Sequence, residues 1–261
     1  MAAQTIDDVI RALDGIIDWA WHEESRLGYF AALYRRVTRA VKDGIAQGRF
    51  QNGPLMERLD VNFANRYLEA FGQFRAGQPP TLSWQIAFRA AHWWRPIVVQ
   101  HLLAGINAHI NLDLGVAAAI TSPGDQLPGL QTDFDQINAV LAGLVSTVEK
   151  EMATVSPLLG WLEKLSLKTD SAIIDFSLDE ARKFAWDHAV KMAPLPPEQM
   201  QAAIHDLDLE ASKFGHMVVS PPWLVKVELA PIRFFESGNV RRVLDVLAAA
   251  KPAVAAAPAS G

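Results

Sequence analysis

The chain has 261 residues, of which 50% are hydrophobic, and its formal net charge is −5. Lysine and arginine are not gathered into a long run, which argues against a nucleic-acid partner because such partners need a concentrated basic patch. The lack of cysteine excludes disulfides, thiolate nucleophiles and cysteine-held metal clusters. The N-terminus shows no basic region followed by an apolar block, so we expect no signal peptide and a cytoplasmic location.

Apolar residues recur at helical spacing in most segments, and no block shows the alternation of a half-buried strand. Turn and capping residues divide the chain into predicted helices at residues 6–21, 27–48, 55–74, 84–95, 97–120, 132–155, 158–168, 178–192, 197–215 and 239–250. Segment 223–235 is ambiguous between helix and strand. The sequence therefore predicts an all-α fold, with residues 1–250 forming one domain of about nine or ten helices. The Ala/Pro-rich tail, 251–261, is expected to be disordered.

A buried central helix is predicted from the longest apolar run, residues 97–120, which begins after Pro96 and ends at a Ser-Pro-Gly turn. The run is long enough to span a bilayer, but its interior His, Asn and Asp residues make insertion costly, so we expect no membrane span. A buried polar group needs a partner or costs free energy. These residues therefore form either a structural network or a site.

Helical geometry sorts these polar residues into two pairs. His109 and Asp113 lie one turn apart on one face, whereas Asn107 and Asn111 form a second pair on nearly the opposite face. A His/Asp pair at this spacing either shares a divalent ion or lets the carboxylate orient the imidazole for proton transfer. His101 sits about 12 Å along the axis from His109, which is too far for one metal ion to bind both.

Further candidates lie on neighbouring predicted helices. Asp60 sits at the edge of a buried stripe, where an acid is either paired with an arginine or a ligand. His92 lies about one turn before the central helix and within reach of the same cavity, although a histidine beside two tryptophans is more often a packed core residue. Arg182 and Trp186 form a row that either lines a small-molecule pocket or packs as core with an extended cation.

Three blocks of the sequence, residues 56–70, 102–114 and 134–138, resemble the hallmark blocks of an uncharacterised bacterial family, a domain of unknown function of similar length. The resemblance covers most of residues 20–190 and implies no assigned activity. It directs attention to the polar residues of these blocks, which are Asp60, Asn107, His109, Asn111 and Asp113.

A looser similarity is to zinc-dependent phospholipase C and P1-type nucleases, whose sites also use a His-x-x-x-Asp helix. It maps onto His109 and Asp113 alone. The N-terminal tryptophan ligand, the export signal and the dense His/Asp set of those enzymes have no counterpart here. This similarity is a fold-level analogy, which is a poor guide to function.

Three functional hypotheses follow, of which the first is favoured by a small margin. In the first, the protein is a metal-dependent, hydrolase-type enzyme acting on a small molecule. His109, Asp113 and Asp60 hold Zn, Mn or Fe, with His92 as a further ligand, and the ion activates a bound water. In the second, His109 oriented by Asp113 performs metal-free acid/base chemistry on a small molecule in a pocket built from tryptophans, among them Trp84.

In both enzyme hypotheses the substrate contacts Asn107, Asn111, Trp93, Trp186 and Arg182. The third hypothesis is a non-enzymatic helical binding or scaffold protein, in which the same polar residues are hydrogen-bonded parts of the core. The substrate, the metal and the oligomeric state are left open by the sequence.

Overall fold

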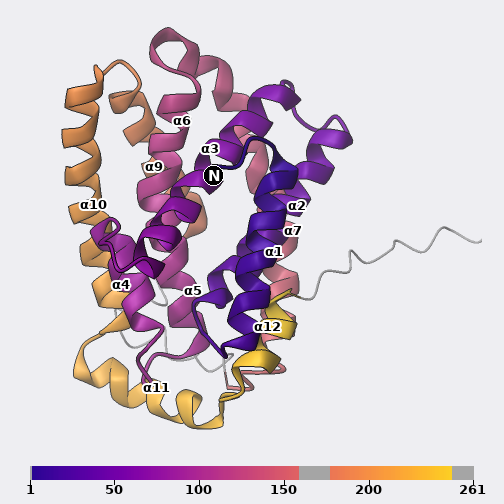
Figure 1. The fold of residues 1–261 in the computed structure, drawn as a ribbon, viewed down its shortest axis with the longest axis vertical. Helices are drawn as coiled ribbons and strands as arrows, with labels where there is room; N and C mark the ends of the chain where they lie inside the picture. Colours follow the sequence, from indigo (N-terminus) through magenta and orange to yellow (C-terminus); the bar gives the residue numbers. More distant parts are fainter. Residues whose placement is uncertain (1, 159–176, 249–261) are drawn as a thin grey trace, which may run out of the picture.

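The computed structural model describes residues 2–158 and 177–248 (Figure 1). Every regular element within these ranges is helical, which confirms the all-α prediction. The elements are α1 (Ile6–His22), α2 (Gly28–Ala46), α3 (Gly53–Arg75), α4 (Leu82–Ala90), α5 (Val98–Asn107), η1 (Ala108–Leu114), α6 (Gly115–Thr121), η2 (Gly124–Leu130), α7 (Gln131–Met152), α9 (Leu178–Met192), α10 (Pro197–Val219), α11 (Trp223–Phe235) and α12 (Val240–Ala248). The predicted tail, and all but the first residue of the predicted helix 158–168, lie outside the described residues.

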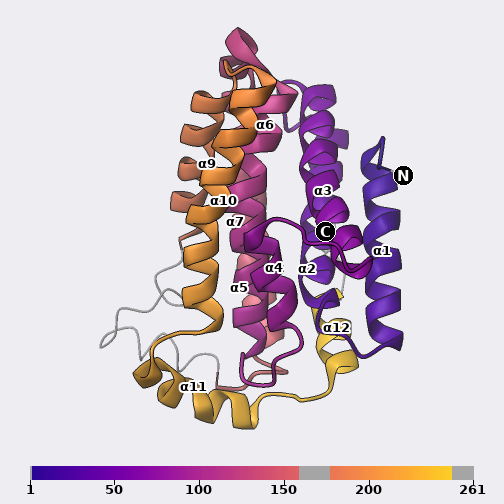
Figure 2. The same cartoon turned by 60° about the vertical axis from the view of Figure 1, so that its left-hand side comes forward.

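The predicted central helix is present and organises the packing. Elements α5, η1 and α6 form one continuous helix, Val98–Thr121, between α2 and α3 on one side and α9 and α10 on the other (Figure 2). Helix α4 also packs on it, while α1 covers the outer side of α2. The helix is apolar and long enough to cross a membrane, but 72% of its most apolar window is buried by other parts of the protein. Such burial is typical of a core helix.

Local sequence explains the start of several helices. Thr5 and Asp8 form a capping box at the start of α1, and Asn239 accepts a hydrogen bond from the backbone N–H of Arg242 at the start of α12. Segment 223–235, which the pattern left ambiguous, is the helix α11. Its apolar residues Val225, Leu229 and Ile232 recur at helical spacing and are buried.

Several predicted helices differ from the structure by a few residues at their ends, and one of them also differs in its cap. The helix expected at 84–95 is α4, which starts at Leu82 and ends at Ala90. Ser83, whose side chain and position just before Trp84 are typical of an N-cap, lies inside the helix. Asp208 of α10 instead accepts hydrogen bonds from the backbone N–H groups of Leu82 and Ser83 and from the Ser83 hydroxyl. The cap therefore comes from a distant part of the chain, which a local pattern cannot reveal.

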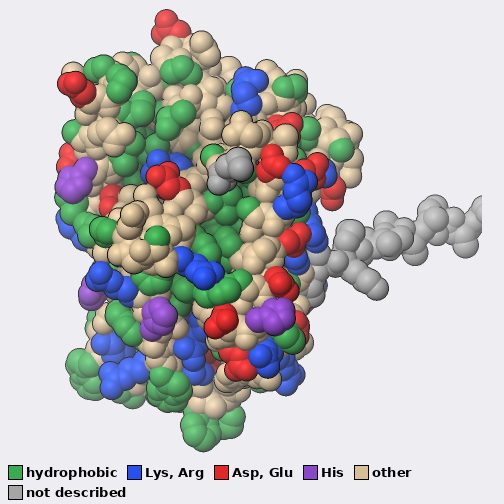
Figure 3. All heavy atoms as spheres, in the orientation of Figure 1, with side chains coloured by type: hydrophobic (Ala, Val, Ile, Leu, Met, Phe, Trp, Pro, Cys, Tyr) green, Lys and Arg blue, Asp and Glu red, His purple; other side chains and the backbone are tan. Residues whose placement is uncertain are grey.

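Helix α11 crosses one end of the bundle and carries large exposed apolar side chains (Figures 1 and 3). The exposed set on this helix is Trp223, Leu224, Val227, Phe234 and Phe235. Trp94 of the neighbouring loop is exposed as well, and the guanidinium of Arg233 lies over its ring. This end of the molecule is thus much more apolar at its surface than a typical helical face.

Candidate functional site: a His–Asp pair beside an apolar cavity

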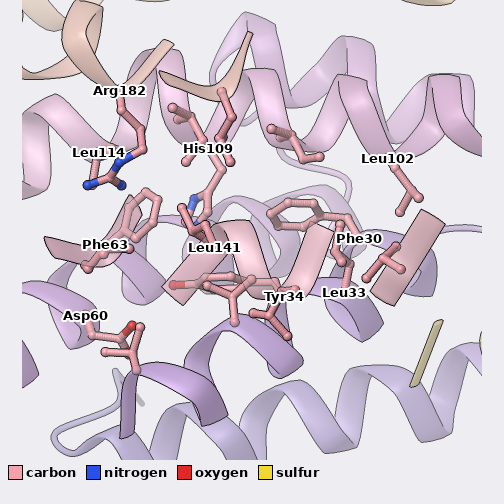
Figure 4. Close-up of a pocket in the computed structure, with 18 of the residues that line it drawn as sticks. Phe30, Leu33, Tyr34, Asp60, Phe63, Leu102, His109, Leu114, Leu141 and Arg182 are labelled. Atoms are coloured by element: carbon pink, nitrogen blue, oxygen red, sulfur yellow. The ribbon is translucent and has the colours of Figure 1, made fainter. Parts of the chain in front are cut away.

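A cavity of about 260 Å³ lies along the central helix, between it and helices α2, α3, α7 and α9. Its walls are almost entirely aliphatic and aromatic, with Phe30, Leu33 and Leu102 toward one end and Phe63 and Leu114 toward the other (Figure 4). An apolar cavity of this size is a candidate ligand site.

His109 projects from the central helix into this cavity and is held from behind by Asp113. The Nδ1 atom of His109 lies 3.3 Å from Oδ2 of Asp113. The same carboxylate accepts hydrogen bonds from Nε of Arg66 at 2.7 Å and from the indole N–H of Trp84 at 2.8 Å. Because an ionised carboxylate only accepts, Nδ1 is inferred to carry the proton of a neutral His109 ring.

The electrostatics keep the carboxylate charged and the imidazole neutral. Burial raises the pKa of Asp113, but Arg66, His109 and Trp84 outweigh it and hold that pKa below its ordinary value. Burial lowers the pKa of His109, and the attraction of Asp113 only partly offsets this effect. His109 therefore presents an unprotonated Nε2 at neutral pH.

Nε2 of His109 is buried and has no hydrogen-bond partner among the described residues. Aromatic rings fix the imidazole in place: Phe63 stacks on it with ring centroids 3.5 Å apart, and the ring of Tyr34 meets it edge-on at 4.4 Å. A buried acceptor without a partner costs free energy. The lone pair of Nε2 is thus not used by any described residue.

Three other polar side chains lining the cavity each have a buried atom without a hydrogen-bond partner in the described part of the chain. These atoms are the Tyr34 hydroxyl, Oδ2 of Asp60 and Nε of Arg182. Burial, with a smaller contribution from Glu57, raises the pKa of Asp60 to about 8, so this acid is mostly protonated at neutral pH. Burial also lowers the pKa of Arg182, to about 10, which leaves it charged. The cavity therefore combines neutral donors with one cation.

Two features of the backbone place these groups. The central helix widens into the π-helical segment η1, which carries both His109 and Asp113, and π segments are rare and occur often at functional sites. At Gly115 an added Cβ would lie 2.6 Å from the carbonyl oxygen of Ala185, so only glycine permits the close approach of α9. This approach sets Arg182, one turn before Ala185, over the cavity.

The Asn107–Asn111 pair was predicted to bind substrate, but the structure places it away from the cavity. Asn111 donates from its side-chain amide to Oδ1 of Asn107 at 2.8 Å, and Asn107 donates to the backbone carbonyl of Ala211 at 2.9 Å. Asn107 is fully buried, and its bonds join the central helix to α10. Asn111 instead borders a second, more open hollow of about 340 Å³ between the central helix, α9 and α10.

The predicted aromatic residues also lie outside the cavity lining. Trp93 is exposed, and Trp186 packs against Phe134 with ring centroids 4.8 Å apart. Trp84 contributes through its hydrogen bond to Asp113 rather than as a wall of the cavity. Arg182 is the one member of the predicted substrate-binding set that lines the cavity.

The residues predicted to hold a metal do not converge. Asp60 and His109 line the same cavity, but Asp113 lies behind His109 with both oxygens engaged, and His92 is exposed beside Phe74. No group of three or more His, Cys, Asp or Glu side chains that could hold a metal ion occurs among the described residues. Asp60 also forms no ion pair with a described arginine, although an arginine partner was one of the two alternatives predicted for this acid.

Sequence reasoning missed two residues of the site, Tyr34 and Arg66. Tyr34 falls at an apolar position of the predicted helix 27–48, where a tyrosine hydroxyl is the signal of a buried donor. Arg66 occurs in the conspicuous block 56–70, but its pairing with Asp113 depends on how α3 packs against η1. Only the tertiary structure shows that contact.

Comparison with known proteins identifies the family and no activity. No curated protein and no solved structure is significantly similar to the chain, so the looser likeness to phospholipase C and P1-type nucleases finds no support there. Residues 6–221 match the sequence profile of DUF5995, a family of unknown function. This match spans η1 and every cavity-lining residue. The chain therefore belongs to the DUF5995 family.

Proposed function

We propose that the protein is an enzyme that performs metal-free acid/base chemistry on a small, largely apolar molecule bound in the cavity. The observation that carries this proposal is the state of His109: its Nδ1 is held by Asp113, its ring lines the cavity, and its buried Nε2 has no partner among the described residues. A carboxylate behind one ring nitrogen orients the imidazole and stabilises the positive charge that forms when the other nitrogen takes a proton.

The chemistry of the walls assigns a role to each polar group. Nε2 of His109 removes a proton from an acidic C–H or O–H group of the bound molecule, and Asp113 stabilises the resulting imidazolium. The Tyr34 hydroxyl and the protonated Asp60 are donors for an oxygen on which negative charge develops. The proton held on His109 then returns to the product. Because the walls are apolar, these interactions act in a low dielectric, where they are strong.

A divalent metal at His109 is the rival proposal, and the described residues favour it less. Asp113 is saturated by two hydrogen-bond donors besides His109, which suits an orienting carboxylate better than a metal ligand. Elemental analysis of the purified protein distinguishes the two proposals directly.

Proton abstraction is testable without knowing the natural substrate. Methyl ketones with alkyl chains of about six to eight carbons match the size of the cavity, and exchange of their α-hydrogens for deuterium is followed by NMR. We expect the wild-type protein to accelerate exchange and His109→Gln to lose about 10²–10⁴-fold, the usual contribution of a general base. The rate should fall as pH drops through the lowered pKa of His109 and stay level above it.

His101→Gln is the matched control, since His101 is buried on the same helix but does not line the cavity. It should exchange as fast as the wild-type protein. Equal rates for His109→Gln and the wild type would contradict the proposal.

A further inference from the structure

Two polar residues of the cavity lining, Arg182 and Asp60, lie toward the same end of the cavity. Along the central helix, Val99, Leu102, Leu103 and Ile106 line it before His109, and Leu114 lines it after. These positions span on the order of 20 Å of helix, so the cavity is elongated. In Figure 4 Arg182 and Asp60 lie toward one side of His109, while Phe30, Leu33 and Leu102 lie toward the other. An elongated cavity of this kind suits a ligand with one polar head and an apolar chain.

Arg182 supplies the charge at the polar end. Its side chain is 3% exposed and forms no ion pair with a described residue. One guanidinium nitrogen donates to the backbone carbonyl of Phe134, and the group lies 4.4 Å from the centroid of that ring. The carboxylates of Asp135 and Asp179 act on it only through space and are exposed. The Nε–H is left without a partner, although a buried guanidinium normally has its donors satisfied.

No negative charge within the cavity compensates for Arg182. Asp60 is the one acidic residue among the described lining residues, and burial raises its pKa to about 8. A neutral Asp60 neither pairs with the guanidinium nor repels an anion. The missing partner of Arg182 is therefore expected on the ligand.

The volume sets the length of the chain. A cavity of about 150 Å³ accommodates benzene, so the 260 Å³ found here accommodates roughly ten to twelve non-hydrogen atoms, the size of an acid with eight to ten carbons. Aliphatic walls select a hydrocarbon, and the single cation selects an anionic head that matches the planar fork of a guanidinium.

We propose that the cavity binds a medium-chain carboxylate, about eight to ten carbons long, with its carboxylate on Arg182 and its chain running along the central helix toward Leu102. This assignment rests on the proposed function, because it names the class of molecule that lies beside Nε2 of His109.

Calorimetric titration with decanoate and with decanol separates the contribution of the carboxylate to the affinity from that of the alkyl chain. The wild-type protein should bind decanoate more tightly than decanol by on the order of tenfold or more. Arg182→Gln should abolish that preference, and Arg182→Lys, which keeps the charge, should retain part of it. Decanol bound as tightly as decanoate, or an unchanged preference in Arg182→Gln, would overturn the assignment.

A second variant keeps the test valid if Arg182→Gln does not fold. Leu102→Phe fills the apolar end without touching the polar groups, so it should shift the preferred acid from decanoate toward hexanoate. Unaltered chain-length preference would overturn the proposed orientation. His109→Gln should still bind decanoate. If no carboxylate binds the wild-type protein but His109→Gln still loses proton exchange, the proposed ligand class is wrong and the proposed role of His109 as a base stands.

Discussion

The central helix carries two buried histidines, His101 and His109, whose surroundings differ in a way that separates a core residue from a site. Both rings pack against aromatic neighbours, and their exposures are 7% and 2%. His109 has a carboxylate on one nitrogen and a 260 Å³ cavity at the other. His101 has no hydrogen-bond partner on either nitrogen among the described residues and borders only voids of about 10 and 20 Å³.

The charges around the two rings also differ. His101 faces the cations Arg26 and Arg233, with Glu236 engaged by the backbone N–H of Val98. Burial and these two cations lower the pKa of His101 to about 3, and the nearby Pro96 carbonyl opposes them only weakly. Burial beside two cations therefore leaves His101 a neutral histidine with no group to orient it. An orienting carboxylate and room for a ligand are what make His109 a candidate base.

Replacement of Asp113, the carboxylate that contacts His109 and has no counterpart at His101, is expected to have the largest effect on stability. Asp113→Asn leaves Arg66 without its buried counter-ion and places an amide among three donors. We expect a loss of about 3–5 kcal/mol in the free energy of unfolding, measured by urea denaturation. His101→Gln, which breaks no ion pair, is the control and should change little. A loss below about 1 kcal/mol for Asp113→Asn would show that the pair does not hold the helix together.

Replacement of Asp60 tests whether burial keeps this cavity-lining carboxyl group protonated. Its pKa is about 8 in the folded protein against 3.8 for an unperturbed aspartate. Between these values the folded state keeps a proton that the unfolded chain has lost, so stability falls as pH rises. From about pH 5 to pH 7, the stability of Asp60→Asn should gain about 3 kcal/mol relative to the wild type. Parallel stability curves for the two proteins would contradict this.

The pH dependence of stability that His101 produces has the opposite sign. Its pKa is about 3 when folded and 6.5 when unperturbed, so below pH 6.5 the unfolded chain binds a proton that the folded state does not. Stability is therefore lost as pH falls through that window. His101→Leu should resist acid better than the wild type by about 2 kcal/mol near pH 5, with little difference near pH 7. An equal response to acid would mean that His101 is not a neutral core residue.

The smallest expected effect concerns metals. Because Asp113 is already saturated, added Zn, Mn or Fe should leave the melting temperature unchanged, and protein purified without chelator should contain no stoichiometric metal. Near-stoichiometric metal that disappears in His109→Ala would restore the metal-dependent hydrolase hypothesis.

The sequence predicted contacts between residues that are close in the chain, and it did not predict contacts that depend on how the helices pack. The His109–Asp113 and Asn107–Asn111 contacts were predicted because residues four apart on a helix face each other. The π segment was not, since an apolar run has no signal for a local change in helical pitch. Trp84 illustrates the other limit: its role depends on how α4 packs, which periodicity does not encode.

The protonation of the His109 ring tests the proposed chemistry most directly, and NMR of isotope-labelled imidazole nitrogens, assigned with His109→Gln, observes it. At neutral pH we expect a proton on Nδ1 and a bare Nε2 for His109. A proton on Nε2, or a doubly protonated ring at neutral pH, would contradict a base held ready by Asp113.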